Sequence, residues 1–274
     1  MLKDKKILLG VTGGIASYKS PGICSLLRKM GAEVKVVMTK NATEFVTPLT
    51  FQTMSNNTVH CEMFNQLQNM DVEHISLAKW ADIIVIAPAT ANLMGKFANG
   101  IADDMLTTVL MASRSKVILA PGMNTVMLNS DANQKNMETL RKRGMVILDT
   151  KEDFLACNDY GSGKMLEPSE IVDEIDRALI KKDLEGKHVV ITAGPTVEPL
   201  DPVRFISNYS SGKMGYALAD NAKKRGAKVT LISGPTKINV PKVDNFVRVK
   251  TTRDMYDAVG EYFDSCDVLI KAAA

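Results

Sequence analysis

The first candidate binding segment is a glycine-rich turn, GVTGGIASYK, at residues 10–19. Gly13 and Gly14 carry no side chain, so their backbone N–H groups can approach a phosphate at the start of the following helix. Thr39 and Lys40 follow the next apolar run, where a dinucleotide-binding protein would place an acidic residue for the ribose diol. A hydroxyl and an ammonium suit a terminal phosphate better, which predicts a mononucleotide ligand rather than NAD. The alternative is a tight turn without a ligand.

Further candidate residues follow two later apolar runs. Residues 87–93, APATANL, combine small and hydroxyl side chains, so a flat ring or a phosphate could approach the backbone there. Thr90 is also suited to cap a helix N-terminus. Asn124 ends the sequence PGMN at residues 121–124. Its side chain could bind a substrate carboxylate or amide, or cap the next helix.

Histidine and cysteine supply the candidates for proton transfer. His74 lies just inside a short predicted helix, where a lone histidine is more often structural than catalytic. His60 and His188 are interpreted as structural. Cys157 lies in a glycine-rich polar segment, FLACNDYGSGKM, and a loop thiol is more informative than a buried one. Apolar periodic surroundings predict packing roles for the other cysteines, Cys24, Cys61 and Cys266.

A long loop in the second half of the chain, TAGPTVEPLDPVRFISNYSSGKMG at residues 192–215, opens into a predicted helix. Its SSGKMG sequence is not a phosphate-binding P-loop, because Ser207 and Met214 replace the required Gly and Ser/Thr. Loops of this length in α/β proteins are usually functional or disordered. Its polar side chains near the helix start suit an anionic ligand, and the alternative is a flexible solvated loop: Arg204, Asn208, Ser210, Ser211 and Lys213.

The composition excludes several classes of partner. The 274 residues carry 34 Lys+Arg against 31 Asp+Glu, a net charge of +3, whereas a nucleic-acid binder normally carries a basic surplus. No apolar run reaches the ~18 residues of a membrane helix, and the N-terminal sequence lacks a signal-peptide cleavage site. The four cysteines form no CxxC pair, which favours a reducing cytoplasm. We expect a cytoplasmic protein that binds small molecules.

The elements that position these residues alternate between strands and helices. Five short apolar runs read as strands buried on both faces: Lys6–Gly10, Glu33–Met38, Ile83–Ala87, Val117–Ala120 and Met145–Leu148. Helices are predicted between them: Tyr18–Met30, Thr90–Phe97, Asp103–Met111 and Ala132–Arg143. Three helix ends rich in Lys and Arg run into a glycine before a strand, as expected for a capped C-terminus. The pattern predicts an α/β fold with a doubly wound parallel sheet, whose ligands bind at the carboxyl ends of the strands.

The strand–helix pattern restarts at His188, after a charged segment. We therefore predict a first domain at residues 1–185 and a second, Rossmann-like α/β domain at residues 186–274. The chain ends at KAAA, where this pattern requires a further loop and helix. The second domain is accordingly expected to be incomplete.

Taken together, the motifs resemble one family, the bacterial bifunctional phosphopantothenoylcysteine decarboxylase / phosphopantothenate–cysteine ligases of coenzyme A biosynthesis. The resemblance covers the whole length and includes GVTGGIASYK, MTKNATEFVTPLTFQT, HISLAKWAD, IAPATAN, FANGIADD, PGMN, the Cys157 segment and DPVRFISNYSSGKMG. Many motifs in the same order are more specific than any one of them.

The resemblance implies an FMN-dependent decarboxylase in the first domain, acting on 4′-phosphopantothenoylcysteine. His74 matches the residue that assists the oxidative step, Asn124 the residue that holds the substrate carboxylate, and Cys157 the acid that protonates the enethiolate. The segments that hold FMN match Gly13, Gly14, Ile15, Thr39, Thr90, Ala91, Asn92 and Leu93. The family also implies a homo-oligomer built on trimers, which can assemble further into a dodecamer.

The second domain resembles the ligase, which joins phosphopantothenate to cysteine with CTP and Mg²⁺. Asn208 matches a residue implicated in handling the acyl-cytidylate, and Lys271, Ala272 and Ala273 match the start of the CTP-binding segment. The metal ligands are not identified. Because the family continues beyond KAAA with further CTP-binding residues, we expect little or no ligase activity from this chain.

Some positions depart from the family, and two alternative functions stay open. Gly122 stands where Ala is usual, Leu128 where Trp is common and Asn158 where Gly is usual, all beside catalytic positions. One alternative is a related flavoprotein that acts on a peptidyl-cysteine or a prenyl substrate; the attached ligase segment argues against it. The other is a non-catalytic flavin-binding regulatory protein. Such a protein would lack the catalytic histidine or cysteine, and this sequence contains both.

Overall fold

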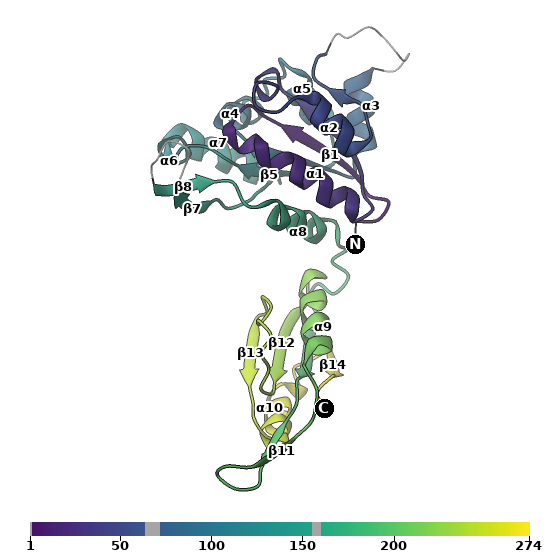
Figure 1. Ribbon diagram of the computed structural model, residues 1–274, viewed down its shortest axis with the longest axis vertical. Helices are drawn as coiled ribbons and strands as arrows, with labels where there is room; N and C mark the ends of the chain where they lie inside the picture. The colour runs from purple at the N-terminus through teal and green to yellow at the C-terminus, as the bar shows by residue number, and fades with distance from the viewer. Residues whose placement is uncertain (1, 64–71, 155–159) are drawn as a thin grey trace. The chain divides into compact units, whose positions relative to one another are not determined.

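The computed structural model describes residues 2–63, 72–154 and 160–274 and divides the chain into two compact units, Met1–Leu179 and Ile180–Ala274 (Figure 1). The boundary predicted at residue 185 lies in a segment that packs on the second unit. Leu184 N donates to the Arg225 carbonyl at 3.1 Å, and the Asp183 carboxylate pairs with the Arg225 guanidinium at 2.8 Å. Residues 183–185 therefore belong structurally to the second unit.

The first unit contains the parallel sheet that the sequence predicts. Its six strands lie in the order β3-β2-β1-β4-β5-β6, and every neighbouring pair is parallel. The strands are β1 (Lys6–Val11), β2 (Glu33–Met38), β3 (Val59–His60), β4 (Ile83–Ala89), β5 (Lys116–Pro121) and β6 (Val146–Ile147). The doubly wound fold is confirmed. The two-residue strand β3 was not predicted, because no apolar run in the sequence indicates it.

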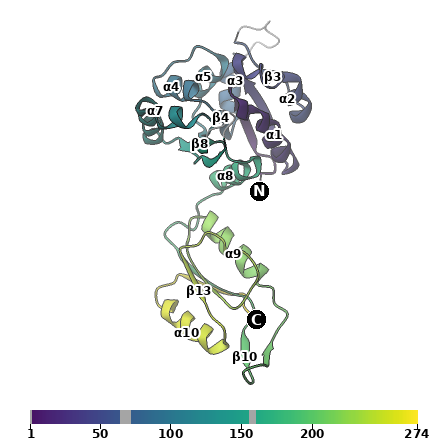
Figure 2. The same cartoon turned by 60° about the vertical axis from the view of Figure 1, so that its left-hand side comes forward.

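Helices cover both faces of this sheet (Figure 2). Ile7 and Leu9 of β1 pack in one apolar cluster with one set of helices, whereas Leu8 packs in a second cluster with the other set. The first set is α1 (Ser20–Lys29), α2 (Pro48–Ser55) and α8 (Pro168–Leu179). The second set is α3 (Glu73–Trp80), α4 (Ala91–Ala98), α5 (Met105–Ala112) and α7 (Asp131–Lys142). Burial on both faces explains why the strands are continuously apolar.

Helix ends follow the predicted capping chemistry. Gly31, Gly144 and Gly226 come directly after the last turns of α1, α7 and α9 (Lys213–Lys224), with φ of +85°, +87° and +93°. Each of these last turns carries two basic side chains. The glycines adopt left-handed conformations that other residues avoid, and the cations complement the helix dipole, so this expectation is confirmed.

The helix predicted near Tyr18–Met30 is confirmed as α1, which begins two residues later, after a 3₁₀ turn, η1 (Ile15–Lys19), and has Pro21 in its first turn, where the missing N–H is tolerated. One local prediction was wrong. The segment around Cys157, interpreted as a loop, contributes a hairpin of β7 (Lys151–Phe154) and β8 (Tyr160–Lys164). A glycine-rich sequence does not predict a strand. Strand β8 forms because tertiary contacts with the loop after β5 stabilise it. Residues 155–159, including Cys157 and Asn158, lie outside the described residues.

The second unit has its own parallel sheet in the order β13-β12-β9-β14, and one helix packs in the apolar cluster of each face. His188 is buried, and its ring nitrogens lie 3.0 Å from the Ser265 carbonyl and 2.9 Å from the Thr230 hydroxyl, which confirms a structural role. No helix in the described part of either unit is long and apolar enough to cross a membrane. The strands are β9 (His188–Ala193), β12 (Lys228–Ser233), β13 (Asn245–Arg248) and β14 (Val268–Lys271). The remaining elements are α9, α10 (Thr252–Phe263) and an antiparallel pair, β10 (Val197–Pro199) and β11 (Phe205–Ser207).

Cys24 on α1 is fully buried, and burial raises the pKa of its thiol from 9.0 to about 11, with Arg28 partly opposing the shift. Because the pKa of Cys24 is higher in the folded than in the unfolded chain, this thiol contributes fully to the stability of the fold below pH 9. The contribution is lost as the pH rises through about 11. We predict that native Cys24 resists iodoacetamide at pH 8 whereas the half-buried Cys61 reacts. Peptide mass spectrometry of native and urea-denatured protein measures this difference. Equal labelling of both thiols in native protein would contradict it.

Candidate active site

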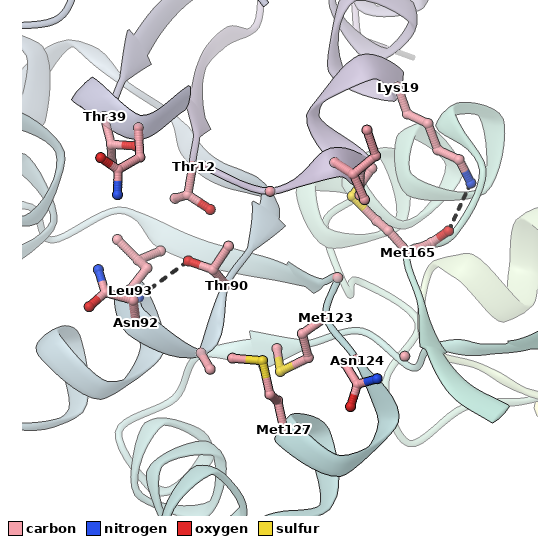
Figure 3. A pocket seen from close by; sticks show the side chains of 18 of the residues that line it. Thr12, Lys19, Thr39, Thr90, Asn92, Leu93, Met123, Asn124, Met127 and Met165 are labelled. Atoms are coloured by element: carbon pink, nitrogen blue, oxygen red, sulfur yellow. Dashed lines mark hydrogen bonds between the residues drawn. The ribbon is translucent and has the colours of Figure 1, made fainter. Parts of the chain in front are cut away.

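One cavity of about 830 Å³ lies at the carboxyl ends of the strands in the first unit (Figure 3). Its volume is in the range of small-molecule and cofactor sites. The sequence-predicted residues that line it are Gly13, Gly14, Ile15, Thr39, Thr90, Ala91, Asn92, Leu93 and Asn124. The eight residues expected to hold a flavin come from three separate segments. They line the same cavity as Asn124, the residue expected to hold the substrate carboxylate, which lies in a fourth segment.

The glycine-rich turn after β1 has no room for a side chain at Gly13. A Cβ on Gly13 would lie 2.4 Å from Cβ of Asn41 and 2.8 Å from its carbonyl carbon, a distance that real Cβ atoms do not adopt. Gly14 is the N-cap of η1 and has more room, since the nearest atom to an added Cβ is Cγ2 of Thr90 at 3.4 Å. The turn therefore brings backbone close to both the loop after β2 and the loop after β4.

Thr39, directly after β2, supplies an unsatisfied polar atom. Its Oγ1 is buried and has no hydrogen-bond partner within the part of the chain that the structure describes. Buried hydroxyls normally have partners, so this one is placed for a hydrogen-bonding ligand group. Lys40 and Asn41 line the cavity beside it. A hydroxyl, an ammonium and an amide at one end of a cavity favour a phosphate or another anion.

The end of β4 is anchored by hydroxyls of residues that follow β1. Thr12 Oγ1 donates to the Pro88 carbonyl at 2.7 Å, and Ser20 Oγ donates to the Ala87 carbonyl at 2.6 Å. Thr90 then caps α4 by accepting from Leu93 N at 3.4 Å, so it both caps a helix and lines the cavity.

The opposite side of the cavity is more apolar. Figure 3 shows Thr12, Thr39, Thr90 and Asn92 apart from the thioethers of Met123, Met127 and Met165. Phe154 of the hairpin also lines the cavity. Hydroxyl and amide groups at one end with polarisable sulfur at the other suit a flat ring that carries an anionic tail.

Asn124 lies on the wall formed by the loop after β5. Its Oδ1 accepts from Val126 N at 2.8 Å and so caps the five-residue helix α6 (Thr125–Asn129). The helix-capping role is confirmed and Asn124 also lines the cavity, whereas its binding of a substrate group stays a prediction.

Charged residues that sequence reasoning missed also line the cavity. Lys19 is buried, and its ammonium donates to the Met165 carbonyl at 3.1 Å and pairs with Glu167 at 2.7 Å (Figure 3). Lys96 contacts Asp103 at 2.7 Å and Asp104 at 3.6 Å. The hydrogen bond to Asp103 is the main reason that the pKa of Lys96 lies above its usual value. Lys19 ends the first glycine-rich motif, Lys96 directly precedes FANGIADD and Asp104 ends it, so the motifs were the available signal.

The other predicted site residues lie elsewhere. His74 is half-buried on α3 and is absent from the described residues that line the cavity. Asn208 lies in the second unit between β11 and α9, where its Oδ1 accepts from Ser210 N at 2.8 Å. Lys271, Ala272 and Ala273 follow or end β14 of the same unit. Cys157 is outside the described residues.

The second-unit candidates share one sheet edge. Thr192, in β9, accepts from Ala272 N with its carbonyl and from Ala273 N with its hydroxyl, both at 3.2 Å. The Thr196 carbonyl accepts from Ser207 Oγ at 2.8 Å, directly before Asn208. The loop after β9 therefore connects both groups of residues at the carboxyl edge of the sheet.

Comparison with known proteins decides the family. Residues 1–180 match the family model described as Flavoprotein, and residues 184–274 match the DNA/pantothenate metabolism flavoprotein C-terminal domain. The coenzyme A biosynthesis bifunctional protein CoaBC of Bacillus subtilis (strain 168) is 47% identical over all of this chain and 68% of its own length. The Escherichia coli (strain K12) CoaBC is 43% identical with the same coverage. This chain belongs to the CoaBC family.

The solved structures that are similar to this chain include decarboxylases and an FMN-binding protein. A PPC decarboxylase mutant complexed with pantothenoylaminoethenethiol is 31% identical, with a TM-score of 0.57 over 64% of this chain and 97% of that chain. The FMN binding protein AtHal3 is 31% identical, with a TM-score of 0.56 over 65% of this chain and 97% of that chain. The FMN-dependent cysteine decarboxylase SpaF is 30% identical, with a TM-score of 0.56 over 65% of this chain and 99% of that chain.

Two of the positions at which this CoaBC chain departs from the expected motifs, Gly122 and Leu128, are structurally accommodated. A Cβ on Gly122 would lie 3.2–3.3 Å from carbon atoms of Ala16, Met165 and Pro88, so the glycine allows tight packing at the cavity wall. Leu128 is buried in the second apolar cluster, where a smaller side chain than Trp still packs against the sheet. The third departure, Asn158, lies outside the described residues.

Proposed function

We propose that the chain catalyses the FMN-dependent decarboxylation of 4′-phosphopantothenoylcysteine to 4′-phosphopantetheine in coenzyme A biosynthesis. The observation that carries this proposal is the cavity that gathers the predicted flavin residues and Asn124, with the buried, unsatisfied Thr39 hydroxyl at its polar end. The match of residues 184–274 to a pantothenate-metabolism domain supports this substrate over a peptide C-terminal cysteine.

The residues present fit FMN. Gly13, Gly14 and Thr39 would hold its phosphate, and residues 90–93 would approach its ring system. When bound, FMN supplies an electron sink that accepts a hydride from the cysteine end of the substrate and later returns it.

The protein's own groups then direct the chemistry. Oxidation of the cysteine end to a thioaldehyde places the carboxylate β to a thiocarbonyl, so that loss of CO₂ gives a stabilised enethiolate. Asn124 binds and orients the carboxylate at the cavity wall. Cys157 protonates the enethiolate during its reduction, and His74 assists the oxidative step. The methionines around Asn124 keep water away from the reacting carbons.

The second unit is assigned to the ligase that joins phosphopantothenate to cysteine with CTP and Mg²⁺. Asn208 handles the acyl-cytidylate, and Lys271, Ala272 and Ala273 bind CTP. The shared edge around the loop after β9 supports this assignment, because ligands of parallel sheets bind at the carboxyl ends of strands.

We assign the enzyme to the cytoplasm and to a homo-oligomer built on trimers, up to a dodecamer. The cysteines of the described residues, Cys24, Cys61 and Cys266, are free thiols, which supports a reducing compartment. The oligomer explains the position of His74: since it lies outside the cavity lining of its own chain, its catalytic role requires the cavity of a neighbouring subunit.

The purified protein is expected to be yellow and to release CO₂ from 4′-phosphopantothenoylcysteine over many turnovers. Cys157→Ser should keep FMN but complete only the oxidative half, so that the flavin absorbance bleaches once and does not recover. Stopped-flow absorbance with product analysis measures this. Cys61→Ser, which removes a thiol away from the cavity lining, should turn over normally. Full product formation by Cys157→Ser would refute the assignment.

Thr39→Val tests the cofactor site. Removing the hydroxyl should weaken FMN binding roughly 10-fold, as expected for a hydrogen bond to a charged group. The FMN-free protein should lose no thermal stability, because the hydroxyl is unsatisfied there. Ser17→Ala is the control, since Ser17 Oγ is also buried and unsatisfied but does not line the cavity. Fluorescence titration that gives the same FMN affinity for Thr39→Val and wild type would overturn the role of this hydroxyl.

The intersubunit role of His74 is tested by complementation. His74→Asn and Asn124→Asp, each inactive alone, should regain part of the activity when co-expressed with different tags and isolated as mixed oligomers. Activity returns because some sites then combine an intact His74 from one chain with an intact Asn124 from another. If both residues act within one chain, every site in the mixed oligomer is defective and the oligomer stays inactive.

A further inference from the structure

We propose that Thr125 is a positioning residue whose hydroxyl joins the Asn124 loop to strand β8. The consequence is that the loop carrying Asn124 is attached to the hairpin on both sides of this residue, while the Asn124 side chain caps its own short helix. This inference rests on the proposed function, in which Asn124 binds the substrate carboxylate.

Two hydrogen bonds bracket Asn124. On one side, Met123 N donates to the Gly163 carbonyl at 3.0 Å. On the other side, Thr125 Oγ1 donates to the Ser162 carbonyl at 2.6 Å. Both acceptors are adjacent residues of β8, so residues 123–125 are attached to a single strand at two points.

The close approach of β8 depends on two glycines. A Cβ on Gly161 would lie 2.6 Å from Thr125 Oγ1, and a Cβ on Gly163 would lie 2.2 Å from the Met123 carbonyl oxygen. Gly163 also has φ of +125°, which side-chain-bearing residues rarely adopt. The strand and the loop therefore fit together through backbone and the Thr125 hydroxyl alone.

The strand itself is fixed at its end. Met165, the residue after β8, is buried in the core, and its carbonyl accepts from the buried ammonium of Lys19. Lys19 ends η1, which follows the Gly13–Gly14 turn. The Thr125 hydroxyl thus connects Asn124 to a strand whose end is anchored on the segment after β1.

The helix α6 is held at its other end. It has five residues, and its buried side chain is that of Leu128, four residues after Asn124. The Leu128 carbonyl accepts from Asn133 and Gln134 of α7. Positioning matters because small misplacements of a group that orients the substrate can cost large factors in rate.

The test compares two substitutions with opposite expectations. Thr125→Val keeps the shape but removes the hydroxyl, and it should raise the KM for 4′-phosphopantothenoylcysteine roughly 3- to 10-fold, with a smaller fall in kcat and unchanged FMN affinity. Thr125→Ser keeps the hydroxyl and should stay near wild type. A packing role for the methyl group predicts the reverse order, with Ser impaired and Val normal, and that order would overturn the proposal.

A second measurement does not depend on activity. Hydrogen exchange of the FMN-loaded enzyme without substrate should be faster in Thr125→Val at the amides of residues 123–126. The control is Thr139→Val, which removes a comparable hydroxyl bond, 2.8 Å to the Lys135 carbonyl, on exposed α7. It should change neither exchange at residues 123–126 nor KM.

The two measurements separate failure of the inference from failure of the proposed function. Unchanged exchange and unchanged KM in Thr125→Val overturn the positioning role. A wild-type enzyme that binds FMN but does not decarboxylate the substrate overturns the proposed function instead. Faster exchange in Thr125→Val would then still establish the hydroxyl anchor itself.

Discussion

The cavity depends on the reversal of strand order beside β1. From β1 the chain adds β2 on one side of the sheet, and it then crosses to add β4 on the other side. The segments after β1 and β4 consequently diverge at the carboxyl edge of the sheet, where parallel α/β proteins bind their ligands. Every flavin residue predicted from the sequence lies in a segment directly after β1, β2 or β4.

Close backbone packing converts this opening into a defined site. The turn at Gly13 contacts the loop after β2 so closely that a side chain would not fit. The hydroxyls of Thr12 and Ser20 donate to carbonyls at the end of β4. Among the residues described, the one buried cavity-lining hydroxyl without a hydrogen-bond partner is that of Thr39. The polar end of the cavity is thus preorganised for a ligand that brings its own acceptor or donor.

The opposite wall is built from an element that is weak by itself. The β7–β8 hairpin carries exposed aromatic side chains, Phe154 and Tyr160, and a cross-strand ion pair between Lys164 and Asp153. The hydrogen bond from Lys164 is the main reason that the pKa of Asp153 lies below its usual value. Exposed ion pairs of this kind nevertheless contribute little stability. Buried contacts at the base of the hairpin, above all Lys19 with the Met165 carbonyl, hold it against the sheet.

Much of the molecule was predictable from the sequence because the relevant physics is local. Continuous Val/Ile/Leu runs identify strands buried on both faces, and basic turns before glycines identify the ends of α1, α7 and α9. The glycine turn and Thr39 predict a phosphate site because their chemistry is visible in a few adjacent residues. The fold class and the predicted residues of the flavin site come from these patterns together with the order of the family motifs.

Tertiary structure alone decided the features that depend on distant partners. Strand β8 is rich in glycine and forms because β7 and the Asn124 loop supply its hydrogen bonds. Lys19 is buried because Met165 and Glu167, far along the chain, receive its ammonium. The sequence places His74 in a motif, but only the fold shows that α3 does not bring it to the cavity lining of its own chain. Local patterns specify elements and chemical groups, whereas the packing of elements distant in sequence determines which groups meet.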